Sequence, residues 1–461
     1  MLPNKIEKII EGMIEIKDRK VAAVVESNLK EKWDELVKLA VFGDEINQRA
    51  ARWVIWETGQ FLGIRPASIY EFYRAVGRGE IIDKLTVPAI NLRGMVYDSS
   101  RAVFKAAKET KTGILILELA RSEMGYTSQS PEEYLLVVMA GAIREDWRGG
   151  LAIQGDHFQA KAVEPGKPKQ GELEIIKQLT KEAIRAGFYN IDIDMSTLVD
   201  LTQPTESKQQ DPNVKYTREM LKFIQEIEPE GIKISVGGEI GHIGGKNSTV
   251  AEFEAYIKGL GEGLTKISVA TGTHHGGVVL ADGTMAELAI DFQVLRDISR
   301  AARKRGLAGA VQHGASTLPE QYFREFVNSG AIEVHLATEF QNIILDHPEF
   351  PEELKNRIYQ WLDSNQAESR KPGQTDEQFY YETRKQAWGE FKFQAWEIPE
   401  EKKVKIRQSL AEKFSFLFKQ LGVENTEKLR EKWIKGKEDH RGLEDFGLKK
   451  TTSESIKGLA D

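Results

Sequence analysis

Side chains that can hold a metal or move a proton gather in one stretch of the sequence, residues 232–277. Two short apolar runs, residues 234–236 and 267–270, have the composition of buried strands, and ionisable side chains follow each run. These side chains are Glu239, His242, His274 and His275. Polar residues just beyond the C-terminal ends of buried strands are typical of parallel α/β active sites, because core strands present their carboxyl ends to the ligand. The stretch therefore predicts an active site at the carboxyl edge of a parallel sheet.

The histidines of the whole chain support a metal at this edge. The sequence has 8 histidines, and most of them fall at or just after a predicted strand end. Those at strand ends are His157, His242, His274, His275, His313 and His335. One such histidine is more often a hydrogen-bonded rim residue than a ligand, but six on one predicted face favour a divalent metal such as Zn²⁺. Because the chain has no cysteine, thiolate ligands and disulfides are excluded.

The elements that must position these residues are short apolar runs alternating with helical patterns. The predicted strands span residues 86–92, 113–119, 150–156, 189–196, 233–241, 266–273, 309–316 and 331–338. Eight such alternations are what a closed (β/α)8 barrel requires. The alternative is an open doubly wound sheet, but the Gly-x-Gly-x-x-Gly signal expected after its first strand is absent. We therefore predict an α/β protein with a TIM barrel over residues 81–346.

The segments on either side of the barrel have helical patterns. In residues 29–39 apolar side chains recur at helical spacing, so residues 1–80 are predicted to form a helical N-terminal extension. Residues 347–461 are charged and helical in pattern, and are predicted to form a helical C-terminal extension. Its aromatic anchors are Trp388, Phe391, Phe393 and Trp396.

Charge and hydropathy exclude two classes of partner. The net charge is -7, whereas binding to nucleic acid requires a clustered basic excess, so no nucleic-acid partner is expected. No apolar run approaches the roughly 20 residues of a membrane helix, and the N-terminus is amphipathic and charged, unlike a signal peptide. We therefore expect no membrane partner and a cytoplasmic location.

Taken together, these segments resemble the class II, metal-dependent fructose-bisphosphate and tagatose-bisphosphate aldolases. The similarity covers residues 86–342, and the matching segments follow the family's order. They are residues 87–91 (the opening strand), 155–157 (the Asp-His pair), 193–196 (around Asp-x-Ser), 239–245 (Glu-x-Gly-x-x-Gly-Gly), 272–276 (Gly-Thr-x-His-Gly), 313–316 (His-Gly-Ala-Ser) and 337–340 (similar to Ala-Thr-Glu-Leu). The last two segments are closest to the tagatose branch.

The resemblance implies roles for individual residues. The implied metal ligands are His157, His275 and His313, with Glu239 and Asp194 at a second or alternate metal position or as braces of the histidines. Three imidazoles leave coordination positions open for substrate oxygens, as in catalytic sites. The metal, expected to be Zn²⁺, would polarise a ketose carbonyl and stabilise an enediolate. Asp156 would be the general base for the hydroxyl proton, or else a partner that orients an imidazole.

Small residues in the loops after the later strands suit phosphate binding. Those that offer accessible backbone amides or lie at the start of the last loop are Gly276, Gly314, Ala315, Ser316, Ala337 and Thr338. Barrels commonly bind phosphate with the loops after strands seven and eight and a helix N-terminus, although small residues also occur in such turns for packing alone. Further candidate substrate contacts are Asn91, Arg121 and Asn247.

The sequence departs from the family pattern at three places. Residues 246–248 are Lys-Asn-Ser where the family has an acidic proton carrier, and an asparagine cannot take a proton at neutral pH. Residues 277–279 lack the family's tyrosine and lysine. His335 replaces an asparagine, and its imidazole could bind substrate, carry the proton or enter the metal sphere.

The resulting prediction is an enzyme, a class II aldolase acting on a phosphorylated ketose. The first alternative is a metal-dependent sugar or sugar-acid epimerase on the same scaffold, and the second is a non-catalytic partner subunit of an aldolase. The resemblance also implies a small-molecule sugar phosphate as ligand and a homo-oligomer, a dimer or larger.

Overall fold

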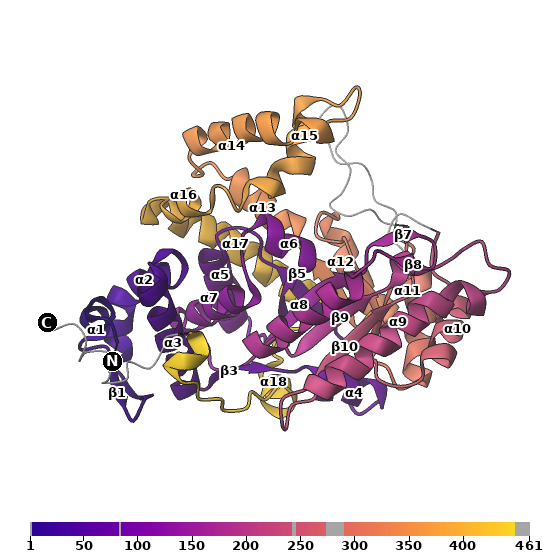
Figure 1. The fold of residues 1–461 in the computed structure, drawn as a ribbon, viewed down its shortest axis with the longest axis horizontal. Coiled ribbons are helices and arrows are strands. Elements are labelled where there is room, and N and C mark those ends of the chain that lie inside the picture. The colour runs from indigo at the N-terminus through magenta and orange to yellow at the C-terminus, as the bar shows by residue number, and fades with distance from the viewer. Residues whose placement is uncertain (1, 83, 242–245, 273–289, 448–461) are drawn as a thin grey trace, which may run out of the picture.

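A ring of eight parallel strands forms the centre of the computed structural model, which describes residues 2–82, 84–241, 246–272 and 290–447 (Figure 1). In chain order the strands are β4 (Val87–Asn91), β5 (Ile116–Ala120), β6 (Gly149–Gln159), β9 (Asn190–Asp194), β10 (Ser235–Glu239), β11 (Lys266–Val269), β12 (Ala310–Gln312) and β13 (Glu333–Leu336). Each pairs in parallel with its neighbours, and β13 pairs back with β4, which closes the ring. The predicted (β/α)8 barrel is confirmed, and each predicted strand range overlaps one observed strand.

Helices connect successive strands and cover the outside of the barrel. They are α5 (Val96–Glu109), α6 (Arg121–Tyr126), α7 (Pro131–Arg144), α8 (Glu172–Ala186), α9 (Glu206–Ile227), α10 (Val250–Leu260), α11 (Phe292–Lys304), α12 (Phe323–Ser329) and α13 (Thr338–Leu345). Short 3-10 turns η1 (Ser196–Leu198) and η2 (Glu320–Tyr322) and a small hairpin, β7 (Ala162–Glu164) and β8 (Lys167–Pro168), lie in the connections. None of the helices in the described part of the chain has the length and apolar character needed to cross a bilayer.

Local sequence accounts for these elements, as α10 and β4 illustrate. Thr249 and Glu252 form a reciprocal capping box at the start of α10, so the helix begins there. Its residues Phe253 and Tyr256 are buried at helical spacing, which turns one face to the barrel. Every residue of β4 is buried because helices cover the outside and side chains fill the inside.

The sequence predicts a helical extension over the first 80 residues, but the structure also contains strands there. These residues contain α1 (Asn4–Ile10), α2 (Glu26–Phe42), α3 (Glu45–Phe61) and α4 (Tyr70–Gly77), but also β1 (Ile14–Lys17), β2 (Lys20–Val24) and β3 (Ile64–Ala67). Asp18 and Arg19 have positive φ angles of 49° and 60°, which is the geometry of a tight hairpin turn between β1 and β2. Strand β3 pairs in parallel with the start of β6 and so adds a ninth strand to the sheet.

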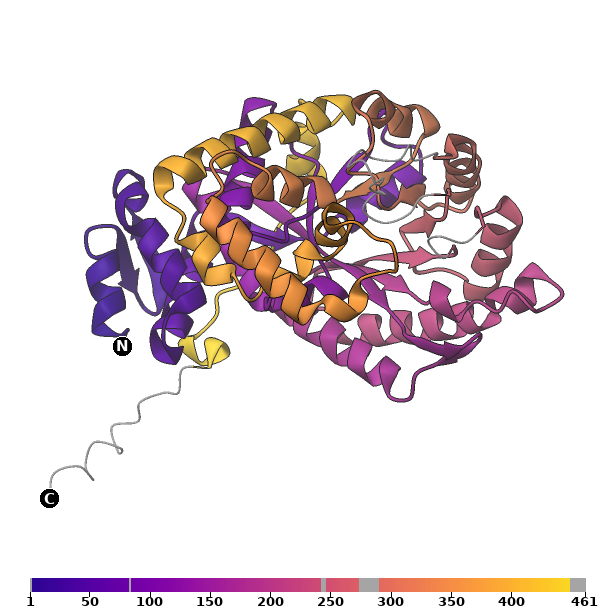
Figure 2. The same ribbon diagram turned by 90° about the horizontal axis from the view of Figure 1, so that it is seen from above.

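The residues after α13 are mainly helical. They form α14 (Glu352–Asn365), η3 (Ala367–Ser369), α15 (Asp376–Thr383), η4 (Arg384–Ala387), α16 (Lys392–Trp396), α17 (Glu400–Gln420), α18 (Glu427–Trp433) and η5 (Leu443–Phe446). Helices α6 and α13 follow directly on barrel strands and so mark the carboxyl side of the barrel. Figure 1 shows α14 and α15 beyond α13 on that side, and Figure 2 shows this orange segment lying across the barrel.

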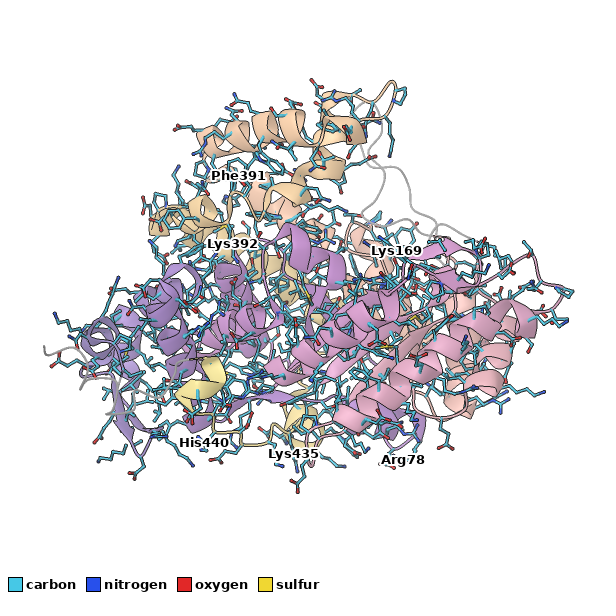
Figure 3. The ribbon with its side chains drawn as sticks, viewed as in Figure 1. Arg78, Lys169, Phe391, Lys392, Lys435 and His440 are labelled. Carbon is cyan, nitrogen blue, oxygen red and sulfur yellow. The ribbon has the colours of Figure 1, made fainter. Side chains whose placement is uncertain are left out.

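The last described residues return to the other side of the molecule. Figure 3 labels Phe391 and Lys392 on the side of α14, and Lys435, His440 and Arg78 on the opposite side. Residues 434–447, which we call the C-terminal strap, lie against α3. The division of the chain into three units at residues 80 and 346 stays a prediction.

Candidate metal and catalytic site

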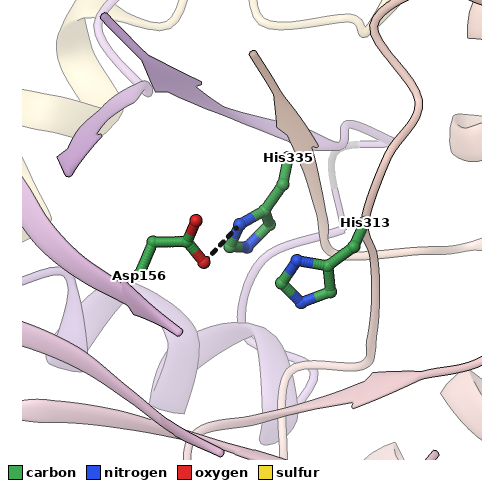
Figure 4. A group of neighbouring side chains, drawn as sticks. All are labelled: Asp156, His313 and His335. Atoms are coloured by element: carbon green, nitrogen blue, oxygen red, sulfur yellow. Dashed lines mark ion pairs between the residues drawn. The ribbon is translucent and has the colours of Figure 1, made fainter. Parts of the chain in front are cut away.

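Imidazoles from distant parts of the sequence meet at the carboxyl end of the barrel. The ring centroids of His157 and His313 are 4.2 Å apart, and those of His313 and His335 are 4.0 Å apart. Asp156 lies beside them, on β6, and Figure 4 shows its carboxylate facing His335 with His313 alongside. The structure thus brings together four of the residues that the sequence analysis selects.

A bulge in β6 turns two consecutive residues towards the site. Successive side chains of a regular strand point to opposite faces. The register of β6 against β9 shifts between Gly155 and Phe158, and His157 has a left-handed φ of 44°. A bulge of this kind re-aims a side chain, and a left-handed residue other than glycine costs about 1–2 kcal/mol. Asp156 and His157 can therefore both serve the site, at the cost of local strain.

Asp194 lies where it can brace His157. Its Oδ2 is 3.3 Å from His157 Nδ1, and its Oδ1 accepts hydrogen bonds from the backbone N and Oγ of Ser196 at 2.9 and 2.6 Å. Burial opposes the charge of Asp194, but the hydrogen bonds from His157 and Ser196 outweigh it and lower the pKa of Asp194. The geometry favours the bracing role, and the role of Asp194 as a metal ligand stays a prediction.

Three residues at the carboxyl end of the barrel have ligand atoms close enough together to hold a divalent ion. One ligand atom each from His157, Glu239 and His313 lie within 4.8 Å of one another. Ligands bound at about 2.0–2.2 Å to one ion lie up to about 4.4 Å apart, so small adjustments suffice. His313 Nε2 lies 3.0 Å from Ser268 Oγ, a contact that orients the ring. Burial and the nearby Asp194 raise the pKa of Glu239 well above its ordinary value, and a cation would favour its charged form.

Part of the predicted set cannot be placed. His275 and Gly276, together with His242 and His274, lie outside the described residues. The roles of His275 as a ligand and of Gly276 in phosphate binding stay predictions.

Asp156 has the surroundings of a general base. It is buried, its Oδ2 accepts a hydrogen bond from Asn91 Nδ2 at 3.1 Å, and its Oδ1 is 3.2 Å from His335 Nδ1. Burial opposes its charge, but His157 and His335 outweigh that effect and hold the pKa of Asp156 well below its ordinary value. Asn91 also donates to Glu123 Oε2 at 2.9 Å, so it fixes the position of the Asp156 carboxylate.

Polar side chains fill the barrel below Asp156, where branched apolar residues are usual. Lys266 Nζ donates to Gln154 Oε1 at 2.8 Å, to Asp192 Oδ2 at 2.9 Å and to Glu333 Oε1 at 2.5 Å. Gln154 Nε2 donates in turn to Glu118 Oε2 at 2.8 Å. This layer was not predicted from the sequence, although Glu118 is a charged residue inside the otherwise apolar strand β5.

His335 joins the layer to the site. Its Nε2 is 2.6 Å from Glu333 Oε1, and its Nδ1 is 3.1 Å from Glu118 Oε1. Burial alone would lower its pKa, but Glu118 and Asp156 outweigh burial and raise the pKa of His335 well above its ordinary value. The raised pKa favours the protonated form of this imidazole, which contacts Asp156.

The described residues that were predicted to bind phosphate lie in loops at the carboxyl end of the barrel. Gly314 has a left-handed φ of 71°, and Ala315 and Ser316 are buried next to it. Ser316 Oγ accepts a hydrogen bond from the backbone N of Glu339 at 3.3 Å, which ties this turn to the start of α13. Ala337 and Thr338 begin that helix, which has no side-chain cap. Their roles in phosphate binding stay predictions.

Two predicted substrate contacts have protein partners instead. Arg121 Nη1 donates to the backbone O of Gln159 at 2.6 Å and pairs with Glu172. Asn247 Nδ2 donates to Asp291 Oδ2 at 3.1 Å. The geometry gives both residues a structural role, and their contact with substrate stays a prediction.

Comparisons with known proteins identify the family to which the chain belongs. The family model "Fructose-bisphosphate aldolase class-II" matches residues 82–391. Among solved structures, the chain is similar to the fructuronate-tagaturonate epimerase UxaE from Cohnella laeviribosi, with a TM-score of 0.51, 12% identity and coverage of 74% of this chain and 82% of that one. It is also similar to fructose-bisphosphate aldolase from Campylobacter jejuni (TM-score 0.47, 15% identity, coverage 77% and 94%) and to the YdjI aldolase from Escherichia coli K12 (TM-score 0.42, 16% identity, coverage 71% and 96%). The family match confirms the resemblance seen in the sequence, and the chain belongs to the class II fructose-bisphosphate aldolase family.

Proposed function

We propose that the protein is a metal-dependent aldolase that cleaves and forms a carbon–carbon bond of a phosphorylated ketose. The observation that carries the proposal is the bulge in β6, which sets an ionised Asp156 beside His157, a donor within reach of Glu239 and His313. A base next to a cation-binding group is what retro-aldol cleavage needs, because a hydroxyl proton must leave while negative charge develops on the ketose oxygens.

The residues of the chain divide the reaction between them. Asp156 takes the proton of the substrate hydroxyl, the C–O bond becomes a carbonyl, and the carbon–carbon bond breaks with its electron pair left on the ketose fragment as an enediolate. A divalent ion held by His157, Glu239 and His313, Zn²⁺ for this donor set, would supply positive charge where the enediolate forms. His335, in contact with Asp156, is placed to return a proton to that fragment in the absence of an acidic residue at 246–248.

The test is metal analysis of the purified protein followed by turnover assays. We expect release of a triose phosphate from a ketose phosphate, loss of activity with chelator, and loss of both metal and turnover in His157→Ala. His347→Ala is the matched control, because His347 contacts Ser409 outside the site. Activity that survives complete metal removal would reject the proposal.

A second candidate is a sugar-acid epimerase working by the same bond cleavage and re-formation. The similarity in fold to the epimerase UxaE motivates it, together with a proton acceptor, Asp156, and a proton donor, His335, at one site. Conversion of a ketose acid into its epimer without release of a fragment would favour this candidate. Homo-oligomer formation and a cytoplasmic location stay predictions.

A further inference from the structure

The rim between the last and the first barrel strands carries an arginine beside the base. Arg93 follows β4, and its Nε pairs with Glu123 Oε1 at 2.6 Å. Its Nη1 donates to Thr338 Oγ1 at 3.3 Å, at the start of α13. Glu123 also accepts a hydrogen bond from Asn91, which in turn holds Asp156. Glu123 and Asn91 thus connect Arg93 to Asp156 through hydrogen bonds.

The segment η4 of the C-terminal extension crosses the same rim. At its beginning, Arg384 Nη1 donates to Asp346 Oδ1 at 2.8 Å and Nη2 donates to Asn342 Oδ1 at 2.5 Å, which fixes it to α13. Just after its end, the ring of Trp388 packs so closely on Gly94 that a Cβ there would overlap it. Lys385 follows Arg384 and precedes Trp388 by three residues, so it belongs to the segment that joins α13 to Gly94, the residue after Arg93.

Lys385 is a partly buried cation with no direct ion pair among the described residues. Within the described residues its ammonium group makes no hydrogen bond or ion pair, and the nearby charges that act on it most are those of Arg93, Glu123 and Glu382. Burial and then Arg93 lower the pKa of Lys385. Glu123 already pairs with Arg93, so a partly buried ammonium beside that pair adds a positive charge that a further anion would neutralise.

We propose that Lys385, Arg93 and Thr338 form an anion subsite that binds the negatively charged end of the substrate while Asp156 meets the hydroxyl. The ligand is an oxyanion, either a phosphate ester or the carboxylate of a sugar acid, because ammonium and guanidinium groups bind both. Lys385 is then a specificity-determining residue supplied by the C-terminal extension. The assignment of this end to a substrate rests on the proposed function, whereas anion binding does not.

The binding test needs no turnover. We expect titration calorimetry of the metal-free protein with inorganic phosphate and with acetate to show binding of at least one anion. Lys385→Met should weaken it about tenfold or more, the value of one charge-assisted hydrogen bond. Lys385→Arg should retain binding, and Lys402→Met, which removes a charge from α17 of the same extension, should match the wild type. Absence of anion binding in the wild type, or equal affinity in Lys385→Met, would overturn the proposal.

The kinetic test identifies the anion. The substrates are a ketose phosphate, a ketose acid and a neutral ketose. For a charged substrate, Lys385→Met should raise KM about tenfold and leave kcat little changed. For the neutral ketose, both KM and kcat should stay at the wild-type values. An effect confined to the phosphate ester assigns a phosphate subsite, and one confined to the acid assigns a carboxylate subsite. Unchanged KM for every charged substrate would overturn the subsite even if aldolase activity is found. If Lys385→Met loses anion binding and the wild type shows no aldol cleavage, the subsite is supported and the proposed function is rejected.

Discussion

At the scale of single residues, the proposed chemistry depends on Asp156 and its imidazole neighbours. Asp156 keeps its charge although it is buried, because His157 and His335 flank it. The two imidazoles have different surroundings: His157 contacts Asp194 and Glu239, and His335 contacts Glu118 and Glu333. One carboxylate therefore lies between a candidate metal ligand and a candidate proton carrier.

The variant Asp156→Asn tests the proposed role of Asp156 as base without removing a predicted metal ligand. The asparagine side chain has nearly the same size and keeps an oxygen that accepts hydrogen bonds, but it cannot take a proton. We expect Asp156→Asn to lower kcat by about a hundredfold or more while the bound metal stays at the wild-type level. Steady-state kinetics with metal analysis of the same samples measures both, and a kcat close to that of the wild type would exclude Asp156 as the base.

Glu118 gives the metal-free protein a pH-dependent stability. Burial, partly opposed by His335, raises the pKa of Glu118 to about 8, whereas an exposed glutamate titrates near 4.3. Between these values the folded protein holds a proton that the unfolded chain has released. The free energy of unfolding therefore falls as pH rises from about 4.3 to about 8, by up to roughly 5 kcal/mol from this group, and levels off above.

The variant Glu118→Gln tests this pH dependence, because glutamine resembles the protonated carboxyl at every pH. We expect the free energy of unfolding to fall less steeply between pH 5 and pH 8 in Glu118→Gln than in the wild type. Urea unfolding at several pH values, with chelator present, measures the two slopes. Parallel curves would show that Glu118 titrates normally in the folded protein.

At the scale of elements, the sequence predicts what depends on local patterns. The barrel strands are apolar runs bounded by turns, so all eight were predictable, and histidines just beyond their ends marked the site. The bulge at His157 was not predictable, because it depends on the register of β6 against β9. The pairing of Lys266 with Glu333 could not be predicted from the sequence either, because 67 positions separate the two residues. The hairpin of β1 and β2 was missed although residues 14–17 alternate as a strand does.

The C-terminal strap is an element whose contribution to stability can be measured. The indole N–H groups of Trp53 and Trp56 donate to the backbone O atoms of Arg441 and Asp439 at 2.8 and 2.7 Å, and Glu57 accepts from the backbone N of Arg441 at 3.0 Å. Removal of residues 434–461 takes away these three hydrogen bonds, each with a net value of about 0.5–1.5 kcal/mol, and the packing of the strap on α3. We expect this truncation to lower the free energy of unfolding by about 3 kcal/mol or more.

Removal of residues 448–461 alone is the matched control for the strap, since it leaves all of these contacts in place. Denaturant unfolding of both truncated proteins should show wild-type stability for the shorter deletion. Equal stability of the two would mean that the strap contributes nothing to the fold.

At the scale of the whole molecule, the two extensions hold opposite ends of the barrel. The N-terminal extension adds β3 beside the amino end of β6, and Tyr73 of α4 donates to Glu333 from that side. The C-terminal extension covers the carboxyl side through η4 and then returns to α3 through the strap. The polar layer and the site above it are therefore enclosed from both sides, and a ligand of the site should report on the stability of the whole barrel.

A divalent ion shared by His157, Glu239 and His313 would tie together three separate parts of the barrel wall, β6, β10 and the end of β12. An ion that binds only the folded protein adds about 2.7 kcal/mol at about a hundred times its Kd. Burial alone would lower the pKa of His157, but Asp156 and Asp194 outweigh burial and raise the pKa of metal-free His157 to about 10. A proton must therefore leave His157 when the ion binds. We expect Zn²⁺ to raise the Tm of the wild type and of His347→Ala, more at pH 8 than at pH 6, and to leave the Tm of His313→Ala nearly unchanged. Scanning calorimetry with and without Zn²⁺ measures the shift, and an equal shift in His313→Ala would place the ion elsewhere.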